Sequence, residues 1–111
     1  MTDCIFCKIV NKEMPANVVY EDDVVLAFRD IKPVSPYHVL LIPKRHSDNI
    51  LKLQKNEILS VFSVVKKLAE EENLEESGFR LVNNNGFDGG QEVGHVHFHM
   101  LGKRQHKWPP G

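Results

Sequence analysis

Three histidines alternate with hydrophobic residues near the C-terminal end of the chain. His95, His97 and His99 are separated only by Val96 and Phe98. Side chains of an extended strand alternate between its two faces, so the three imidazoles would line one face at steps of about 7 Å. A single histidine is usually an ordinary core or surface residue, but three at a strict period of two indicate a chemical site.

Two kinds of site use histidines in this arrangement. Imidazole is a frequent metal ligand, and two histidines at positions i and i+2 of a strand can share a metal ion. A neutral imidazole is also a nucleophile, and neighbouring histidines then position and protonate the reacting groups. The glycine-rich turn 84–90, which Gln91 follows, favours the nucleophile, because backbone amides freed by glycines can close on phosphate oxygens.

A second group of chemically active residues opens the chain. Cys4 and Cys7 have a spacing shared by redox pairs, by zinc sites and by cysteines with no special role. A redox pair of the thioredoxin type follows a strand and opens a helix, whereas this pair begins the chain, so the redox interpretation is the weakest. Zinc needs four ligands, and because the sequence has no second cysteine pair, histidines must supply the others.

The elements that must position these residues follow from the hydrophobic periodicity. Alternating or continuous apolar runs predict five strands, over residues 18–20, 24–28, 38–42, 79–83 and 95–101. The first two strands form a hairpin, and Pro43 closes the third. The pattern is α+β: an antiparallel sheet of about five strands, with one long helix packed on it.

The long helix is predicted from Asn56, as its cap, to about Glu72. Apolar residues recur at helical spacing on one face, namely Ile58, Val61, Phe62, Val65, Leu68 and Ala69. We expect this face to cover Val96, Phe98 and Met100, which leaves the three histidines on the opposite side of the sheet.

Composition narrows the class of protein. The 111 residues predict one domain, spanning 1–111, with ordinary globular shares of apolar (41%) and charged (26%) residues. With 14 basic and 15 acidic residues the net charge is −1, which argues against a nucleic-acid partner and favours a small ligand. No apolar run approaches the ~20 residues of a membrane span, and the first residues do not resemble a signal peptide. We therefore expect a cytoplasmic protein with reduced cysteines and no membrane partner.

The segment His95–Leu101 resembles the signature of the histidine triad (HIT) family. Further segments match that family in the expected order along the chain: 4–9, 28–31, 38–46 and 88–91. The terminal Trp108-Pro109-Pro110-Gly111 resembles the Hint branch, which acts on nucleoside phosphoramidates, rather than the Fhit branch, which acts on dinucleoside polyphosphates. The resemblance implies a HIT-like fold and a homodimer. Glu92 departs from the pattern, because animal Hint proteins carry serine there.

The resemblance also implies roles for individual residues. His97 would attack the α-phosphorus of a purine nucleoside 5′-phosphoramidate, forming a covalent nucleotidyl intermediate that water hydrolyses. The carbonyl of His95 would orient the His97 ring, while His99 and His38 would contact the phosphate. The implied nucleotide-binding residues are Ile5, Phe6, Ile9, Phe28, Asp30, Asn84, Gln91, Val93 and, from the tail, Trp108. By residue type alone, the apolar members are equally well explained as core and Asp30 as a turn residue.

The same resemblance favours zinc for the cysteine pair. Related proteins bind zinc through such a pair, a histidine like His46 and the first histidine of the triad, which here is His95. We therefore expect a structural zinc ion on Cys4, Cys7, His46 and His95, and no organic cofactor. Three alternatives remain: a dinucleoside polyphosphate hydrolase, a nucleotide-binding regulatory module with weak turnover, and a metalloenzyme whose triad holds the metal.

Overall fold

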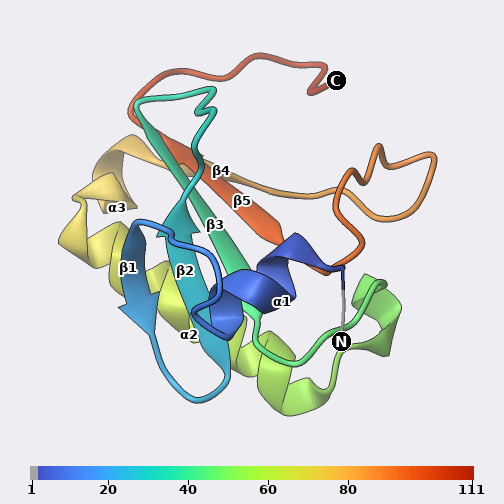
Figure 1. The fold of residues 1–111 in the computed structure, drawn as a ribbon. Coiled ribbons are helices and arrows are strands. Elements are labelled where there is room, and N and C mark those ends of the chain that lie inside the picture. The colour runs from blue at the N-terminus through green and yellow to red at the C-terminus, as the bar shows by residue number, and fades with distance from the viewer. Residues whose placement is uncertain (1–2) are drawn as a thin grey trace.

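The computed structural model, which describes residues 3–111, is built on one antiparallel sheet of five strands (Figure 1). The strands are β1 (Val18–Glu21), β2 (Val25–Arg29), β3 (Tyr37–Pro43), β4 (Phe79–Asn83) and β5 (Phe98–Gly102). Their order across the sheet is β1-β2-β3-β5-β4, so the last two strands lie in reverse sequence order. This arrangement confirms the predicted α+β class.

The two faces of the sheet are covered by different helices. The long helix α2 (Lys55–Glu71) lies behind the sheet in Figure 1, and the short helix α1 (Ile5–Val10) lies in front. Alternate residues of β2 and β3 point to each side, and both strands are buried almost throughout. Phe98 and Met100 pack in the cluster that includes α2, as predicted. The opposite cluster contains Phe6 and Ile9 of α1 and faces the histidine side of the sheet.

The start of α2 differs from the prediction. The cap is Gln54, not Asn56, because Glu57 returns to accept the Gln54 backbone N–H at 2.7 Å and completes a capping box. The buried Glu57 carboxylate also takes two hydrogen bonds from Arg45, at 2.9 and 2.8 Å. Asn56 lies inside the helix and contributes no cap.

The buried face of α2 is also rotated from the predicted one. Val61, Val65, Leu68 and Ala69 are buried as expected, and Val64 joins them. Ile58 and Phe62 are instead 42% and 46% exposed, together with Leu59. The face of a helix that packs on a core is narrower than the set of apolar residues on α2. The spacing of these residues therefore did not show which of them are buried.

Three short helices were absent from the prediction: α1, η1 (Ile50–Lys52) and α3 (Leu74–Ser77). The last predicted strand is also shorter than expected and begins at Phe98 rather than His95. Before that point the backbone leaves the sheet, since the Val96 N–H donates to the Ser47 carbonyl at 2.7 Å.

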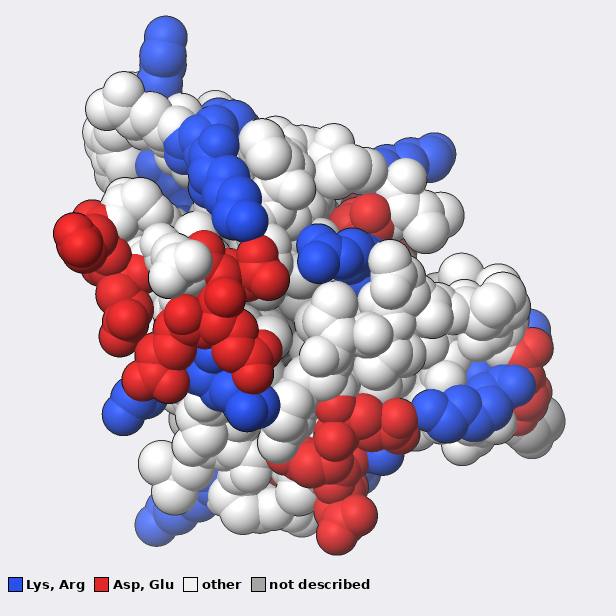
Figure 2. Space-filling view, turned by 90° about the vertical axis from the view of Figure 1, so that its left-hand side faces the viewer, with Lys and Arg blue, Asp and Glu red and all other residues white. Residues whose placement is uncertain are grey.

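The surface carries charges of both signs. Figure 2 shows acidic and basic side chains interspersed on one face of the molecule, without a continuous basic area. Among residues 3–111, no helix is long and apolar enough to cross a membrane.

Candidate active site and metal centre

The histidines on the α1 side of the sheet meet because β3 and β5 are neighbours. His99 of β5 is paired with Leu40 of β3, and His38 lies two residues before Leu40 on the same face. His97 immediately precedes β5 and its ring centroid lies 5.1 Å from that of His99. The structure therefore brings His38, His97 and His99 together. The period of two pointed to His97 and His99, only the family resemblance pointed to His38, and the ring of His95 lies in a separate cluster described below.

His97 is held in one tautomer by the backbone. Its Nδ1 lies 2.8 Å from the carbonyl oxygen of His95, an acceptor, so Nδ1 carries the proton and Nε2 keeps a free electron pair. The ring is 5% exposed and packs edge-on against Phe6, with centroids 5.1 Å apart. Asn83 fixes the backbone beneath it, because its Nδ2 donates to the His97 carbonyl at 3.0 Å. The sequence did not point to Asn83, because it lies on the neighbouring strand β4 and its contact with His97 is not local in the sequence.

A directed chain of hydrogen bonds orients His99. The Val34 N–H donates to His38 Nδ1 at 3.0 Å, so the proton of neutral His38 sits on Nε2. That Nε2 lies 2.9 Å from Nδ1 of His99, which must accept, and the His99 proton is thereby placed on Nε2. Burial, with smaller contributions from the His97 and His38 rings, lowers the pKa of His99 to about 4. His99 is therefore a neutral donor at cellular pH.

Asp30 completes this group. Its Oδ2 lies 3.4 Å from His38 Nε2, and its Oδ1 accepts the Lys32 N–H at 2.8 Å. Burial lowers the pKa of His38, and the nearby Asp30 carboxylate partly offsets this effect. The ligand atoms of Asp30, His38 and His99 lie within 4.8 Å of one another. A metal bound here would need the Nε2 electron pair of His38, so the ring proton would have to move to Nδ1. There it would face the Val34 N–H, which is also a donor. This group is therefore better suited to hydrogen bonding than to binding a metal.

A pocket of about 500 Å³ opens beside these histidines, within the size range of small-molecule sites. Its lining combines apolar side chains with the histidines and other polar groups. The predicted nucleotide-binding residues that line it are Ile5, Phe6, Ile9, Phe28, Asp30, Asn84 and Val93. His97 and His99 line it as well, whereas His38 and His95 are buried behind its wall. Met14, Pro15 and Leu40, which the sequence analysis did not single out, are further apolar residues of the pocket lining.

The lining of the pocket also offers backbone donors. Glu92 and Val93 both line it, and within residues 3–111 their N–H groups have no hydrogen-bond acceptor. The turn before them is tightly closed, and a Cβ added at Gly89 would collide with the backbone of Asn85. Unpaired amides beside a glycine turn, next to a histidine donor, form an environment suited to a phosphate group.

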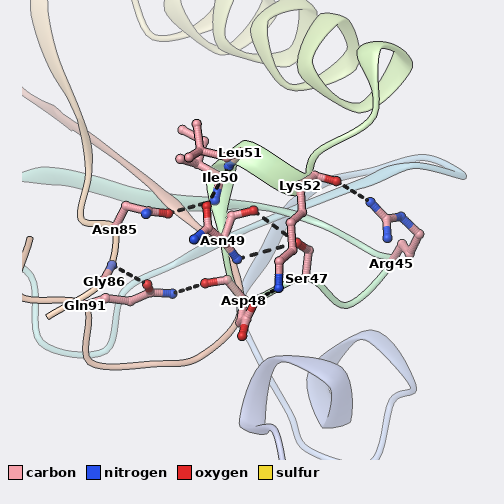
Figure 3. Close-up of polar contacts among 10 residues, drawn as sticks. All are labelled: Arg45, Ser47, Asp48, Asn49, Ile50, Leu51, Lys52, Asn85, Gly86 and Gln91. Carbon is pink, nitrogen blue, oxygen red and sulfur yellow. Dashed lines mark hydrogen bonds and ion pairs between the residues drawn. The ribbon is translucent and has the colours of Figure 1, made fainter.

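Two predicted nucleotide-binding residues do not line the pocket. Trp108 is 82% exposed in the C-terminal tail and away from the pocket of its own chain. Gln91 turns its side chain away, toward the segment that follows His46 (Figure 3). Its amide bonds to backbone groups instead, and these contacts are described below.

The second cluster joins Cys4, Cys7, His46 and His95, as predicted. Cys4 Sγ lies 3.3 Å from His95 Nδ1, and Cys7 Sγ lies 3.3 Å from His46 Nδ1 and 3.6 Å from His95 Nδ1. In a tetrahedron with ordinary zinc–sulfur and zinc–nitrogen bonds, neighbouring sulfur and nitrogen ligands are about 3.5 Å apart. The four residues therefore fit a tetrahedral zinc ion.

The groups around this cluster favour a metal ligand. His95 Nε2 lies 2.8 Å from the Pro43 carbonyl and so carries the proton, which leaves Nδ1 free to bind a metal. The Cys7 N–H donates to Cys4 Sγ at 3.4 Å at the start of α1. Without a metal, burial and the neighbouring Cys4 raise the pKa of the Cys7 thiol to about 11. Because zinc binds the thiolate, a zinc ion would have to offset this cost of deprotonation. The same His95 thus offers its ring to the metal cluster and its carbonyl to His97.

Comparison with known sequences identifies relatives over nearly the whole chain. A protein of Brassica juncea named "14 kDa zinc-binding protein" is 51% identical, over 98% of this chain and all of the relative. A protein of Arabidopsis thaliana named "Adenylylsulfatase HINT1" is 50% identical, over 96% of this chain and 76% of the relative.

A solved structure has the same architecture. The HIT family hydrolase of Legionella pneumophila superposes with a TM-score of 0.92 at 49% identity, covering 98% of this chain and all of the other. The family model described as "HIT domain" matches residues 11–106. The chain is a member of the HIT domain family.

Proposed function

We propose that this protein hydrolyses purine nucleoside 5′-phosphoramidates to the nucleoside monophosphate, with His97 as the nucleophile. The contact that carries the proposal is the one between His97 Nδ1 and the His95 carbonyl, which leaves Nε2 unprotonated and beside the pocket. Family membership supports a nucleotide hydrolase, and the names of the Legionella and Arabidopsis relatives point the same way.

The reaction has two displacement steps at phosphorus. In the first, the Nε2 electron pair of His97 attacks the α-phosphorus, the phosphorus–nitrogen bond breaks, and the amine leaves with a proton from solvent. In the second, water attacks the same phosphorus, the bond to Nε2 breaks, and the proton of the water passes to solvent. The His95 carbonyl stabilises the positive charge that His97 carries in the intermediate.

Other pocket residues assist without forming bonds to phosphorus. The His99 Nε2–H and the amides of Glu92 and Val93 stabilise charge on the phosphate oxygens. Asp30 accepts hydrogen bonds from the ribose hydroxyls, and Phe6 and Phe28 pack against the purine. These assignments rest on their positions around one pocket.

The zinc ion is structural in this proposal. When bound, it crosslinks the N-terminal helix to the core. His97 lies outside the four-ligand cluster and its Nε2 stays free for chemistry. Reduced cysteines suit a cytoplasmic location.

The protein acts as a homodimer in this proposal, through the edge strand β4 and helix α2. Phe79 on the strand and Ile58, Leu59 and Phe62 on the helix are exposed. Exposed apolar side chains beside a free strand edge favour association with a second copy. The Trp108 tail then reaches the site of the partner.

The test is turnover of a fluorogenic adenosine phosphoramidate by wild type, His97→Asn and the control His106→Asn, which changes a histidine outside the pocket. We expect His97→Asn to lose at least about 1,000-fold in kcat and the control to keep wild-type turnover. Mass spectrometry of rapidly quenched wild type should show a nucleotidyl adduct on His97. Undiminished turnover by His97→Asn would overturn the assignment. Faster hydrolysis of dinucleoside polyphosphates or adenylyl sulfate by wild type would replace the substrate class.

A further inference from the structure

The side chain of Gln91 bonds to three separate backbone groups, of which Figure 3 shows those of Asp48 and Gly86. Its Nε2 donates to the Asp48 carbonyl at 3.2 Å and to the Val93 carbonyl at 3.0 Å. Its Oε1 accepts the Gly86 N–H at 2.8 Å, while its own backbone N–H donates to the Gly86 carbonyl at 3.1 Å. Both amide hydrogens are therefore committed to carbonyl groups, and none remains for a phosphate oxygen.

These bonds connect the pocket loop to the segment that carries the metal ligand His46. Asp48 is two residues beyond His46, so the Gln91 contact joins the loop directly to that segment. A second bond joins the same two regions, because Asn85 Oδ1 accepts the Ile50 N–H at 2.7 Å. Local hydrogen bonds also hold this segment together, since Ser47 Oγ donates to the Asn49 carbonyl at 3.1 Å and Asn49 Oδ1 accepts the Leu51 N–H at 2.8 Å.

On the pocket side, the connection made by Gln91 reaches two residues of the pocket lining. Gln91 immediately precedes Glu92 and Val93, whose N–H groups are unpaired within residues 3–111. The Gln91 side chain holds its own residue in place and also bonds to the Val93 carbonyl. These contacts on both sides fix the direction of the Glu92 and Val93 N–H bonds. Displacing reacting groups by about 1 Å can lower a rate by about 100-fold.

We propose that Gln91 is a positioning residue: it ties the backbone amides of Glu92 and Val93 to the His46–Ile50 segment, so that occupancy of the metal cluster controls how firmly those amides are held. Because a metal bound by His46 restrains the start of that segment, its loss frees Asp48 and weakens the anchor of Gln91. The effect on catalysis rests on the proposed function, whereas the mechanical link does not.

The first test is hydrogen exchange on the zinc-loaded protein without nucleotide. Gln91→Met keeps the volume of the side chain and removes its hydrogen bonds, and Gln105→Met makes the same change at an exposed glutamine of the tail. We expect Gln91→Met to speed exchange at least tenfold in residues 84–94 and also in residues 47–50. The control should match wild type. Unchanged exchange in Gln91→Met would overturn the proposal.

The second test asks whether the metal acts through Gln91. Zinc removal by a chelator should speed exchange in residues 84–94 of wild type, and should add less than twofold in Gln91→Met, where the link is already broken. Two independent effects that multiply would refute the coupling. The exchange comparison on zinc-loaded protein stands even if the metal-free protein unfolds.

Kinetics then separate positioning from direct nucleotide contact. On the adenosine phosphoramidate, Gln91→Met should lower kcat about 10- to 100-fold with KM changed less than threefold, because the amides act on the transition state. A rise in KM with unchanged kcat would show that Gln91 contacts the nucleotide and would refute the positioning role. If wild type is inactive on phosphoramidates, the proposed function fails while the exchange experiments still decide the link.

Discussion

Lowering the pH from 7 to 5 should destabilise this protein in part through His99. Burial, together with the nearby His97 and His38 rings, lowers its pKa to about 4. In the unfolded chain the same imidazole has its ordinary pKa of about 6.5. Between these two values the unfolded chain binds a proton that the folded chain does not. The contribution of His99 to the free energy of unfolding is therefore fully present above about pH 6.5. It decreases as the pH is lowered and reaches its minimum near pH 4.

The size of the effect follows from the two pKa values. At pH 5 the unfolded His99 is almost fully protonated and the folded one is largely neutral. The ratio of the two binding polynomials is about 30, which corresponds to a loss of about 2 kcal/mol in the free energy of unfolding. That is a large fraction of the roughly 5–15 kcal/mol typical of a small domain.

Urea denaturation of zinc-loaded wild type and His99→Asn at pH 7 and pH 5 measures this contribution. Asparagine does not titrate, so the variant should lose about 2 kcal/mol less than wild type over the same interval. Metal release and the lowered pKa of His95 act on both proteins and largely cancel in the difference. Because His38 bonds directly to His99 and also has a lowered pKa, the comparison is repeated with His38→Asn in both proteins. If the two proteins lose the same free energy within about 0.5 kcal/mol, the neutral state assigned to His99 is wrong.

Two further predictions concern carboxylates. Arg45→Met should lower the free energy of unfolding by about 2–3 kcal/mol, because it leaves the buried Glu57 carboxylate without its partner. Glu57→Gln removes that charge and should cost only about 1 kcal/mol. Thermal or urea unfolding measures both variants, and equal costs would contradict the prediction. Glu92 lines the pocket and makes no hydrogen bond or ion pair within residues 3–111. Unit charges roughly 6 Å apart in water repel by about 0.7 kcal/mol. Glu92→Ser should therefore raise the rate with a phosphoramidate whose leaving amine carries a carboxylate about threefold, relative to one with an uncharged amine, and an unchanged ratio of kcat/KM values would refute this selection by charge.

Features that depend on local periodicity could be predicted from the sequence. The alternation around His97 predicts that the intervening apolar residues face α2, and the structure confirms this for Val96, Phe98 and Met100, although β5 itself begins only at Phe98. The positions of Cys4 and His46 in one cluster are also confirmed, although only family resemblance, and not spacing, pointed to that set.

Other features depend on contacts between distant segments, and no local signal reveals them. The cap at Gln54 follows from Glu57, whose carboxylate is held by Arg45 twelve residues earlier. The role of Gln91 depends on Asp48, 43 residues away in the sequence. Helix α1 is six residues long, too short to show a hydrophobic period.

The double use of His95 has a consequence for how this protein can diverge. The bond that fixes the His97 tautomer comes from a main-chain carbonyl, which every amino acid possesses. Substitutions at Cys4, Cys7 or the His95 ring can therefore abolish the proposed zinc site without removing the acceptor that orients the His97 ring. The proposed zinc site depends on side chains, which a mutation can remove, whereas the orientation of the His97 ring depends on a main-chain carbonyl, which a substitution at position 95 retains.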